Sequence, residues 1–363
     1  MKNPKSPPHG GNIYHYAEML GIPPGEILDF SASINPLGPS KMALKAIKAA
    51  MAELVNYPDP DSSALITALS DKFSLAADSM LAGNGSTELI YLIPRALRPS
   101  RALVLAPSFS DYARAVDLSG GKVVHFPLKE ADGFVPDVDA LVKAITGVDM
   151  LFLCNPNNPT GVLLDRDRVV YILTNARRAG SFVVLDEAFI EYAPGGSVID
   201  EAVSKPGVAV LRNFTKFHGM PGLRAGWLAA HRSVISRIKA RREPWSVNTL
   251  AERAAAASLS DTMYERKSLE LFNRERVRLL NGLSGIPGFF VYATSANFLL
   301  IRVDTPGLTS GGLAERLAVK GILIRDCSNF KGLDGRFVRV AVRNRQDNER
   351  LVAAIGEAMN AGY

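Results

Sequence analysis

The sequence predicts an α/β protein with a large, mainly parallel sheet domain and a smaller α+β unit after it. First, short apolar runs alternate with helix-length segments between residues 101 and 230, which is the βαβ rhythm of a doubly wound sheet. Second, several of these runs are apolar at consecutive positions, as in strands that are buried on both faces. Third, the pattern changes after Pro287 to short strands separated by single helices.

The expected elements follow from this pattern in chain order. In the large domain the apolar runs predict strands at residues 101–106, 122–126, 150–154, 182–186, 208–212 and 225–230. Apolar residues near helical spacing predict helices at 41–54, 62–73, 165–179, 249–258 and 263–284. After them we expect strands at 289–292, 298–303, 322–325 and 337–342, with helices at 311–320 and 347–359.

These elements divide the chain into three parts. Residues 1–40 are rich in Pro and Gly, so we interpret them as an arm that packs on the small domain and the active site. Residues 41–260 are expected to form the large, cofactor-binding domain. Residues 261–363 are expected to form the small C-terminal α+β domain.

The composition excludes several classes of protein. A hydrophobic content of 47% and a charged content of 21% are those of an ordinary globular protein. The 42 basic residues exceed the 36 acidic ones by only six and are dispersed, so no nucleic-acid partner is expected. Two cysteines, Cys154 and Cys327, provide no disulfide framework, which favours the reducing cytoplasm. Without a run of about eighteen apolar residues, we expect neither a membrane span nor a signal peptide.

Lys216 is the centre of the most informative motif. Asp186 precedes it at the end of an apolar run, and Arg224 follows eight residues later. A lysine can hold an aldehyde as a Schiff base, a carboxylate can keep a pyridine nitrogen protonated, and a guanidinium can neutralise a phosphate. Together these residues predict a site for pyridoxal 5′-phosphate, and no metal. The alternative for any single lysine is an ordinary surface position.

A phosphate-binding loop is predicted before the first helix of the large sheet. Gly85, Ser86 and Thr87 precede a helical pattern, so backbone N–H groups and the positive end of the helix can face an anion. Such residues also cap helices with no ligand at all. Thr215 and Arg224 would complete a three-sided cradle.

Three further residues have both a ligand-binding and a structural interpretation. Asp186 ends a buried strand at the carboxyl edge of the sheet, where α/β proteins bind ligands, but it could also be a helix N-cap. Asn158 lies in the turn after residues 150–154 and could hydrogen-bond the hydroxyl group of the cofactor ring. Phe109 could stack on that ring or belong to the core.

The order and spacing of these motifs resemble the fold-type I aminotransferase superfamily. That resemblance implies a large domain of the seven-stranded type. Within the superfamily, the chain resembles the threonine-phosphate decarboxylases of cobalamin biosynthesis and the closely related histidinol-phosphate aminotransferases. The motifs are His-Gly-Gly-Asn at 9–12, Leu-Asp-Phe-Ser-Ala-Ser-Ile-Asn-Pro-Leu-Gly at 28–38, Tyr-Pro-Asp at 57–59, and the segments 244–248, 322–327 and 338–343.

The resemblance assigns roles to individual residues. Lys216 and Asp186 would be catalytic. The cofactor would be bound by Asn158, Asp186, Thr215, Lys216 and Arg224, with Tyr57 reaching the phosphate from the partner subunit.

The substrate would be bound by a second set of residues. The resemblance implies that Arg339 binds an acidic group and that Arg325 and His9 face the substrate phosphate. Asn158 would also contact the substrate. Asn35, in the arm, is a polar group able to donate to phosphate.

Two residues depart from the family pattern. Phe189 stands where most aminotransferases have Tyr, which removes a hydroxyl near the ring oxygen, although the decarboxylases tolerate Phe there. Ser33 stands where the family has Asn, so we assign that side chain no role in phosphate recognition.

The resemblance implies decarboxylation of L-threonine O-3-phosphate to (R)-1-aminopropan-2-yl phosphate and carbon dioxide, by a homodimer with shared active sites. The alternative is a histidinol-phosphate aminotransferase that uses 2-oxoglutarate and glutamate. A third hypothesis, a non-catalytic module that senses the cofactor, is disfavoured because every catalytic position is kept. The sequence does not distinguish threonine phosphate from serine phosphate or histidinol phosphate.

Overall fold

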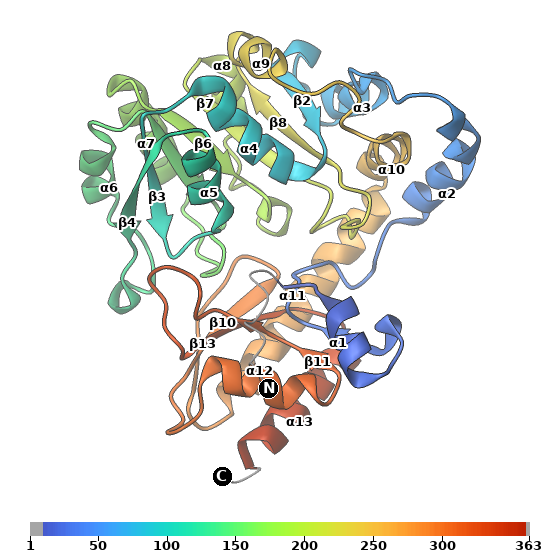
Figure 1. Ribbon diagram of the computed structural model, residues 1–363, viewed down its shortest axis with the longest axis vertical. Helices are drawn as coiled ribbons and strands as arrows, with labels where there is room; N and C mark the ends of the chain where they lie inside the picture. The colour runs from blue at the N-terminus through green and yellow to red at the C-terminus, as the bar shows by residue number, and fades with distance from the viewer. Residues whose placement is uncertain (1–9, 361–363) are drawn as a thin grey trace.

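The computed structural model describes residues 10–360 and has two lobes (Figure 1). The larger lobe holds a seven-stranded sheet with helices on both faces, and the smaller holds a four-stranded antiparallel sheet. The long helix α11 (Thr262–Ser284) leads from the large lobe into the small one. The predicted fold class, a large α/β domain followed by a smaller α+β domain, is confirmed.

The large sheet has the strand order β2-β8-β7-β6-β5-β3-β4. Strand β8 runs antiparallel to both neighbours, whereas the other paired strands are parallel. Strands β3, β5 and β6 have the predicted bounds, and β2 was not predicted. The strands are β2 (Met80–Gly83), β3 (Arg101–Ala106), β4 (Lys122–Pro127), β5 (Met150–Cys154), β6 (Phe182–Asp186), β7 (Val208–Asn213) and β8 (Gly226–Ala230).

Helices cover both faces of this sheet because its central strands are apolar on both sides. Val183 and Leu185 of β6 belong to the core under α6 and α7, whereas Val184 belongs to the core under α4, α5 and α9. The helices of the large lobe are α2 (Lys41–Ala50), α3 (Ser63–Phe73), α4 (Gly85–Leu97), α5 (Asp111–Leu118), α6 (Val138–Ile145), α7 (Arg166–Arg178), α8 (Ile199–Ser204), α9 (Arg232–Lys239) and α10 (Thr249–Leu259).

The small lobe packs its sheet against α11, α12 and α13. Its strand order is β12-β13-β10-β9. The elements are β9 (Phe289–Val291), β10 (Phe298–Val303), α12 (Ser310–Ala318), β11 (Ile322–Leu323), β12 (Arg325–Asp326), β13 (Phe337–Ala341) and α13 (Arg345–Asn360). The single strand predicted at 322–325 is two short strands in two different sheets.

The N-terminal arm contains more structure than the sequence predicts. It forms α1 (Ile13–Leu20) and β1 (Leu28–Asp29), and β1 pairs in parallel with β11 of the small lobe. Ala17 and Ile27 pack with Ala318 and Leu323 in a small apolar cluster.

Short 3₁₀ turns occur along the chain. They are η1 (Pro24–Glu26), η2 (Met51–Val55), η3 (Ala77–Ser79), η4 (Glu130–Asp132) and η5 (Ile190–Tyr192).

The predicted site residues lie where the two lobes face each other. Asp186 and Asn213 end β6 and β7, so both are at the carboxyl edge of the large sheet. Arg325 and Arg339 lie on β12 and β13 of the small lobe. Within residues 10–360, no helix is long and apolar enough to cross a membrane, and no cluster of His, Cys, Asp or Glu suits a metal ion.

Candidate active site

Two adjoining cavities bring most of the predicted residues together. The inner cavity, of about 160 Å³, is lined by Ser86, Thr87, Phe109, Tyr112, Asn158, Asp186, Phe189, Thr215, Lys216 and Arg224, among others. The outer cavity, of about 460 Å³, shares six of these residues and adds Gly10, Ser31, Arg325 and Arg339, among others. The inner cavity therefore belongs to the large sheet, and the outer cavity is completed by the arm and the small lobe.

The loop that carries Lys216 is held by hydrogen bonds from several elements. The Asn213 side-chain oxygen accepts from the N–H groups of Thr215 and Lys216, at 3.0 and 3.1 Å. The Lys216 carbonyl accepts from the Asn35 N–H at 3.0 Å and from the Tyr192 hydroxyl at 3.4 Å. Because the backbone N–H and the carbonyl of Lys216 are both hydrogen-bonded, the loop presents the Lys216 side chain to the cavities in one orientation.

The Lys216 amine lies in an environment that disfavours its charge. Burial, and after it the positive charges of Arg339 and Arg224, lowers the pKa of Lys216 to about 8, although the nearby Asp186 and Asp29 act in the opposite direction. Its Nζ is 5.8 Å from the centre of the Phe189 ring. A lysine with a lowered pKa is a better nucleophile at neutral pH, because more of it is the free amine.

Asp186 is buried and accepts two hydrogen bonds, but it forms no ion pair among the described residues. Its Oδ2 accepts from the Tyr112 hydroxyl at 2.6 Å, and its Oδ1 accepts from the Ala188 N–H at 2.9 Å. Burial nevertheless raises the pKa of Asp186 to about 6, although these hydrogen bonds and Lys216 favour the charged form. A cationic ring N–H beside Asp186 would relieve this cost.

Tyr112 is a site residue that the sequence did not reveal. It lies in α5, is fully buried, and its ring stacks on Phe152 at 5.1 Å between centroids. Phe109 meets the same ring edge-on at 5.6 Å. The only sequence feature that could have indicated this role is its position three residues after Phe109. A tyrosine in an amphipathic helix is ordinarily a core residue.

The predicted phosphate cradle is assembled at the start of α4. Ser86, Thr87, Thr215 and Arg224 line the inner cavity together. Gly85 has φ of +73°, and a Cβ there would lie 2.6 Å from Arg224 Nη2, so a larger residue would displace the guanidinium. Three hydroxyls, a helix N-terminus and a guanidinium thus converge, which suits a phosphate.

Asn158 joins the inner and outer cavities. Its side-chain oxygen accepts from Arg339 Nη1, a hydrogen bond between the large and the small lobe. Arg339 Nη2 also donates to the Ser31 carbonyl of the arm at 2.9 Å. The Arg339 Nε is buried and has no hydrogen-bond partner within residues 10–360.

Arg325 and Arg339 face the outer cavity from paired strands. They are direct partners in the register between β12 and β13, and each is less than a tenth exposed. Arg325 donates to the Asn329 side chain at 2.7 Å and lies over the Phe330 ring. Burial lowers the pKa of Arg325, and burial lowers that of Arg339 to about 10, so acidic groups of a ligand would be favourable here.

Two predicted residues lie outside both cavities, and a third is not described. Asn35 is buried and donates to the Phe217 carbonyl, the Tyr264 hydroxyl and Ser268, so it supports the Lys216 loop instead of facing the substrate cavity. Tyr57 is 80% exposed and lines neither cavity. His9 falls outside the described residues.

The two departures from the family pattern also have distinct surroundings. Phe189 lines both cavities and packs edge-on against Phe298 at 5.0 Å. Ser33 lines neither cavity; its buried Oγ has no hydrogen-bond partner among the described residues. Asp29, which the sequence analysis did not single out, accepts from the Ser31 N–H and hydroxyl and so shapes the arm beside Arg339.

The residues present fit pyridoxal 5′-phosphate. The inner cavity combines a lysine of lowered pKa, a buried carboxylate that lacks a counter-charge and a phosphate cradle. Lys216 would hold the aldehyde carbon, Asp186 the ring N–H, and Ser86, Thr215 and Arg224 the phosphate.

Comparison with known proteins identifies the family. The model of the aminotransferase class I and II family matches residues 25–355. The threonine-phosphate decarboxylase of Salmonella typhimurium is 39% identical over 350 residues, which cover 96% of this chain and 95% of that protein. A histidinol-phosphate aminotransferase of Roseiflexus castenholzii is 38% identical over 355 residues, or 94% of this chain and 92% of that protein.

The solved structures agree with these relatives. The crystal structure of L-threonine-O-3-phosphate decarboxylase from Porphyromonas gingivalis superposes with a TM-score of 0.82 at 27% identity, and covers 92% of this chain and all of that one. The chain therefore belongs to the aminotransferase class I and II family. It is an enzyme that depends on pyridoxal 5′-phosphate.

The first prediction concerns the titration of Lys216. In the cofactor-free protein, competitive acetylation followed by peptide mapping should show Lys216 reacting with a midpoint near pH 8, because burial and two arginines destabilise its charged form. Arg339→Gln should move the midpoint upward, since one positive charge is removed, and Arg345→Gln on exposed α13 should not. A midpoint near the ordinary lysine value of about 10.4 would contradict this environment.

The second prediction separates Asp186 from the residue that holds it. Asp186→Asn should lower turnover by about two to four orders of magnitude, because breaking a buried charge pair costs about 3–5 kcal/mol, while the phosphate cradle still retains cofactor. Tyr112→Phe should lower turnover about ten- to a hundredfold and shift the absorbance of the bound cofactor. Tyr171→Phe, whose hydroxyl meets Asp139 on the surface, is the matched control. Unchanged spectra in Tyr112→Phe would show that Tyr112 only fills space.

Proposed function

We propose that this enzyme decarboxylates L-threonine O-3-phosphate to (R)-1-aminopropan-2-yl phosphate and carbon dioxide, in cobalamin biosynthesis. The observation that carries the proposal is the pair Arg325 and Arg339, opposite each other on β12 and β13 and both lining the cavity that contains Lys216. A substrate with a phosphate and a carboxylate offers one acidic group to each guanidinium. The threonine-phosphate decarboxylase of Salmonella typhimurium, at 39% identity, and the resemblance of the arm support this assignment.

The residues of the cavity would select the bond that breaks. Bound pyridoxal phosphate supplies an electron sink for the pair released from a bond at the substrate Cα. The bond that stands perpendicular to the ring is weakened, so the orientation imposed by Arg325 and Arg339 decides the outcome. When carbon dioxide leaves, the Cα needs a proton. Lys216 Nζ faces the same cavity and is placed to donate it.

The alternative function is transamination of histidinol phosphate, which the 38% identical relative from Roseiflexus castenholzii favours. The same lysine, aspartate and phosphate cradle would serve that reaction. Histidinol phosphate has a phosphate and an amine but no carboxylate, so one of the two arginines would have no acidic group of that substrate to bind. In that reaction the second arginine would bind a carboxylate of glutamate or 2-oxoglutarate, so the products formed, carbon dioxide or glutamate, distinguish the two functions.

The third prediction compares the two substrates directly. The holoenzyme should release carbon dioxide from L-threonine O-3-phosphate, whereas L-histidinol phosphate with 2-oxoglutarate should yield little glutamate. Arg325→Ala should lower catalytic efficiency with threonine phosphate about ten- to a hundredfold, as expected for the loss of a charge-assisted contact of about 1.5–3 kcal/mol. With unphosphorylated threonine the loss should be much smaller.

Two further variants make this test specific. His9→Ala should lose less than Arg325→Ala, because a guanidinium is permanently charged whereas histidine must first be protonated. Arg345→Ala, on the exposed face of α13, should leave efficiency unchanged. Glutamate formation without carbon dioxide would establish the aminotransferase instead, and full efficiency in both Arg325→Ala and His9→Ala would place the phosphate elsewhere.

We also propose that the enzyme is a homodimer in which Tyr57 reaches the partner's cofactor phosphate. An exposed apolar patch supports this proposal: Met51, Leu54, Val55, Tyr57 and Trp245 are each 47% to 88% exposed. The Tyr57 and Trp245 rings stack with centroids 4.8 Å apart. Large apolar patches of this kind are typical of protein interfaces.

We propose the cytoplasm as the compartment. Both cysteines are buried and form no disulfide bond, which fits that proposal.

The fourth prediction tests this patch. Val55→Lys should weaken the dimer at least about tenfold in sedimentation velocity, because burying a valine contributes about 1.5–3 kcal/mol and a charge cannot replace it. Val319→Lys changes an equally apolar, exposed residue of the small lobe and should leave the dimer intact. An active wild-type monomer at assay concentration would refute the shared site.

A further inference from the structure

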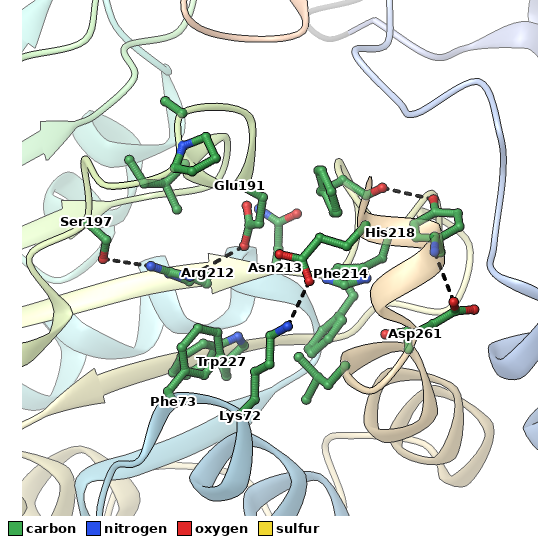
Figure 2. Close-up of a pocket in the computed structure, with 18 of the residues that line it drawn as sticks. Lys72, Phe73, Glu191, Ser197, Arg212, Asn213, Phe214, His218, Trp227 and Asp261 are labelled. Carbon is green, nitrogen blue, oxygen red and sulfur yellow. Dashed lines mark hydrogen bonds and ion pairs between the residues drawn. The ribbon is translucent and has the colours of Figure 1, made fainter. Parts of the chain in front are cut away.

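A further cavity, of about 180 Å³ and distinct from the inner and outer cavities, lies behind the Lys216 loop (Figure 2). It is enclosed by the end of α3, η5 and the segment after it, β7, and the junction where α10 is followed by α11. Phe214 and Phe217, on either side of Lys216 in sequence, line it, but Lys216 itself does not. Of its described lining residues, only Asn213 also borders the inner cavity of the active site. The cavity is therefore separate from the substrate site and touches the loop that carries the reactive lysine.

One oxygen of the Glu191 carboxylate in this cavity lacks a hydrogen-bonding partner. Its Oε2 is buried, and no donor within residues 10–360 reaches it. Its other oxygen is 3.8 Å from Arg212 Nη1, too far for a hydrogen bond. Arg212 is occupied elsewhere, since it donates to Glu187 at 2.9 and 3.0 Å and to Ser197 at 2.7 Å. Burial raises the pKa of Glu191 to about 7, because its surroundings stabilise the charged carboxylate less than water does.

The charged groups around Glu191 leave the cavity with an excess of negative charge. Lys72 is paired with Glu265 at 2.8 Å, and Arg212 is paired with Glu187. Glu191 shares Arg212 with Glu187, at 3.8 Å, and Asp261 has no ion pair among the described residues. Three carboxylates, Glu191, Asp261 and Glu265, thus line the cavity together with two cations, Lys72 and Arg212. Figure 2 shows the Glu191 carboxylate, the Arg212 guanidinium and the Lys72 amine all turned toward the interior. A cationic ligand is therefore favoured over an anionic one.

The remaining walls are largely aromatic. Phe214, Trp227 and Tyr264 line the cavity, and Tyr264 and His218 have nearly parallel rings with centroids 6.5 Å apart. The buried His218 Nδ1 also has no partner among the described residues. Aromatic faces accommodate both apolar groups and organic cations. The volume is below the roughly 300–1,000 Å³ typical of drug-sized ligands, so the ligand must be small.

We propose that this cavity binds a small organic ammonium ion, whose N–H donates to the Glu191 carboxylate and whose apolar part lies against Phe214 and Tyr264. The Lys72–Glu265 pair, with side chains 31% and 47% exposed, stands on the solvent side and marks the entrance. The ligand would touch the Lys216 loop and, through Ser258 and Asp261, the junction that leads into α11. Its position suits an effector that senses both the reactive loop and the link between the lobes.

Calorimetric titration of the holoenzyme with N,N-dimethylbenzylamine tests the proposal. This protonated tertiary amine carries one N–H and one ring, and it cannot form a Schiff base with the cofactor. Benzyl methyl ether is the uncharged control and should bind at least about tenfold more weakly, because it lacks the charge-assisted hydrogen bond. Absence of amine binding, or equal binding of the ether, would overturn the proposal.

Variants locate the binding event. Glu191→Gln keeps the size of the side chain but removes its charge, and should weaken amine binding at least about tenfold. Glu243→Gln, an exposed carboxylate paired with Arg95, should have no effect. Ala193→Leu fills the cavity without altering a charge and should also abolish binding, which keeps the test decisive if Glu191→Gln folds poorly. Undiminished binding in either cavity variant would mean that the amine binds elsewhere.

Discussion

The structure depends on holding one lysine amine where its positive charge is disfavoured. Burial and the charges of Arg339 and Arg224 act on Lys216 together, and the pKa falls to about 8. Such an amine keeps its geometry only if its backbone cannot relax. The loop is accordingly fixed by Asn35 from the arm and Tyr192 from the segment after β6. Elements far from the reactive atoms therefore determine the chemistry of this side chain.

The two lobes supply different parts of the proposed site, one for the cofactor and one for the substrate. The carboxyl edge of the large sheet supplies Asp186 and the phosphate cradle, whereas the small lobe supplies the two guanidiniums. The hydrogen bond from Arg339 to Asn158 joins the two sets directly. Any relative movement of the lobes would change where a substrate acid group lies with respect to Lys216. The cavity behind the Lys216 loop lies at the same junction, which is why its occupant could affect the reaction.

Local patterns predicted elements well where one physical cause dominates. Strands β3, β5 and β6 are apolar on both faces, and their bounds match the sequence pattern. The arm was harder, because α1 is a short helix stabilised mainly by packing on Ala318 and Leu323, more than three hundred residues away. The predicted strand at 322–325 is divided because β11 pairs with the arm and β12 with β13. No local pattern shows which partner a strand will take.

For the site, the sequence alone predicted the reactive set. Lys216, Asp186, Asn158 and Arg224 follow from residue types whose chemistry has few other uses at that spacing, and the structure places them around one cavity. Only the tertiary structure decided that Tyr112 bonds Asp186, that Asn35 supports the loop and that Oε2 of Glu191 has no donor among the described residues. Hydrogen bonding and burial join residues that are distant in sequence, so partners, and the pKa values that depend on them, arise only when the chain has folded.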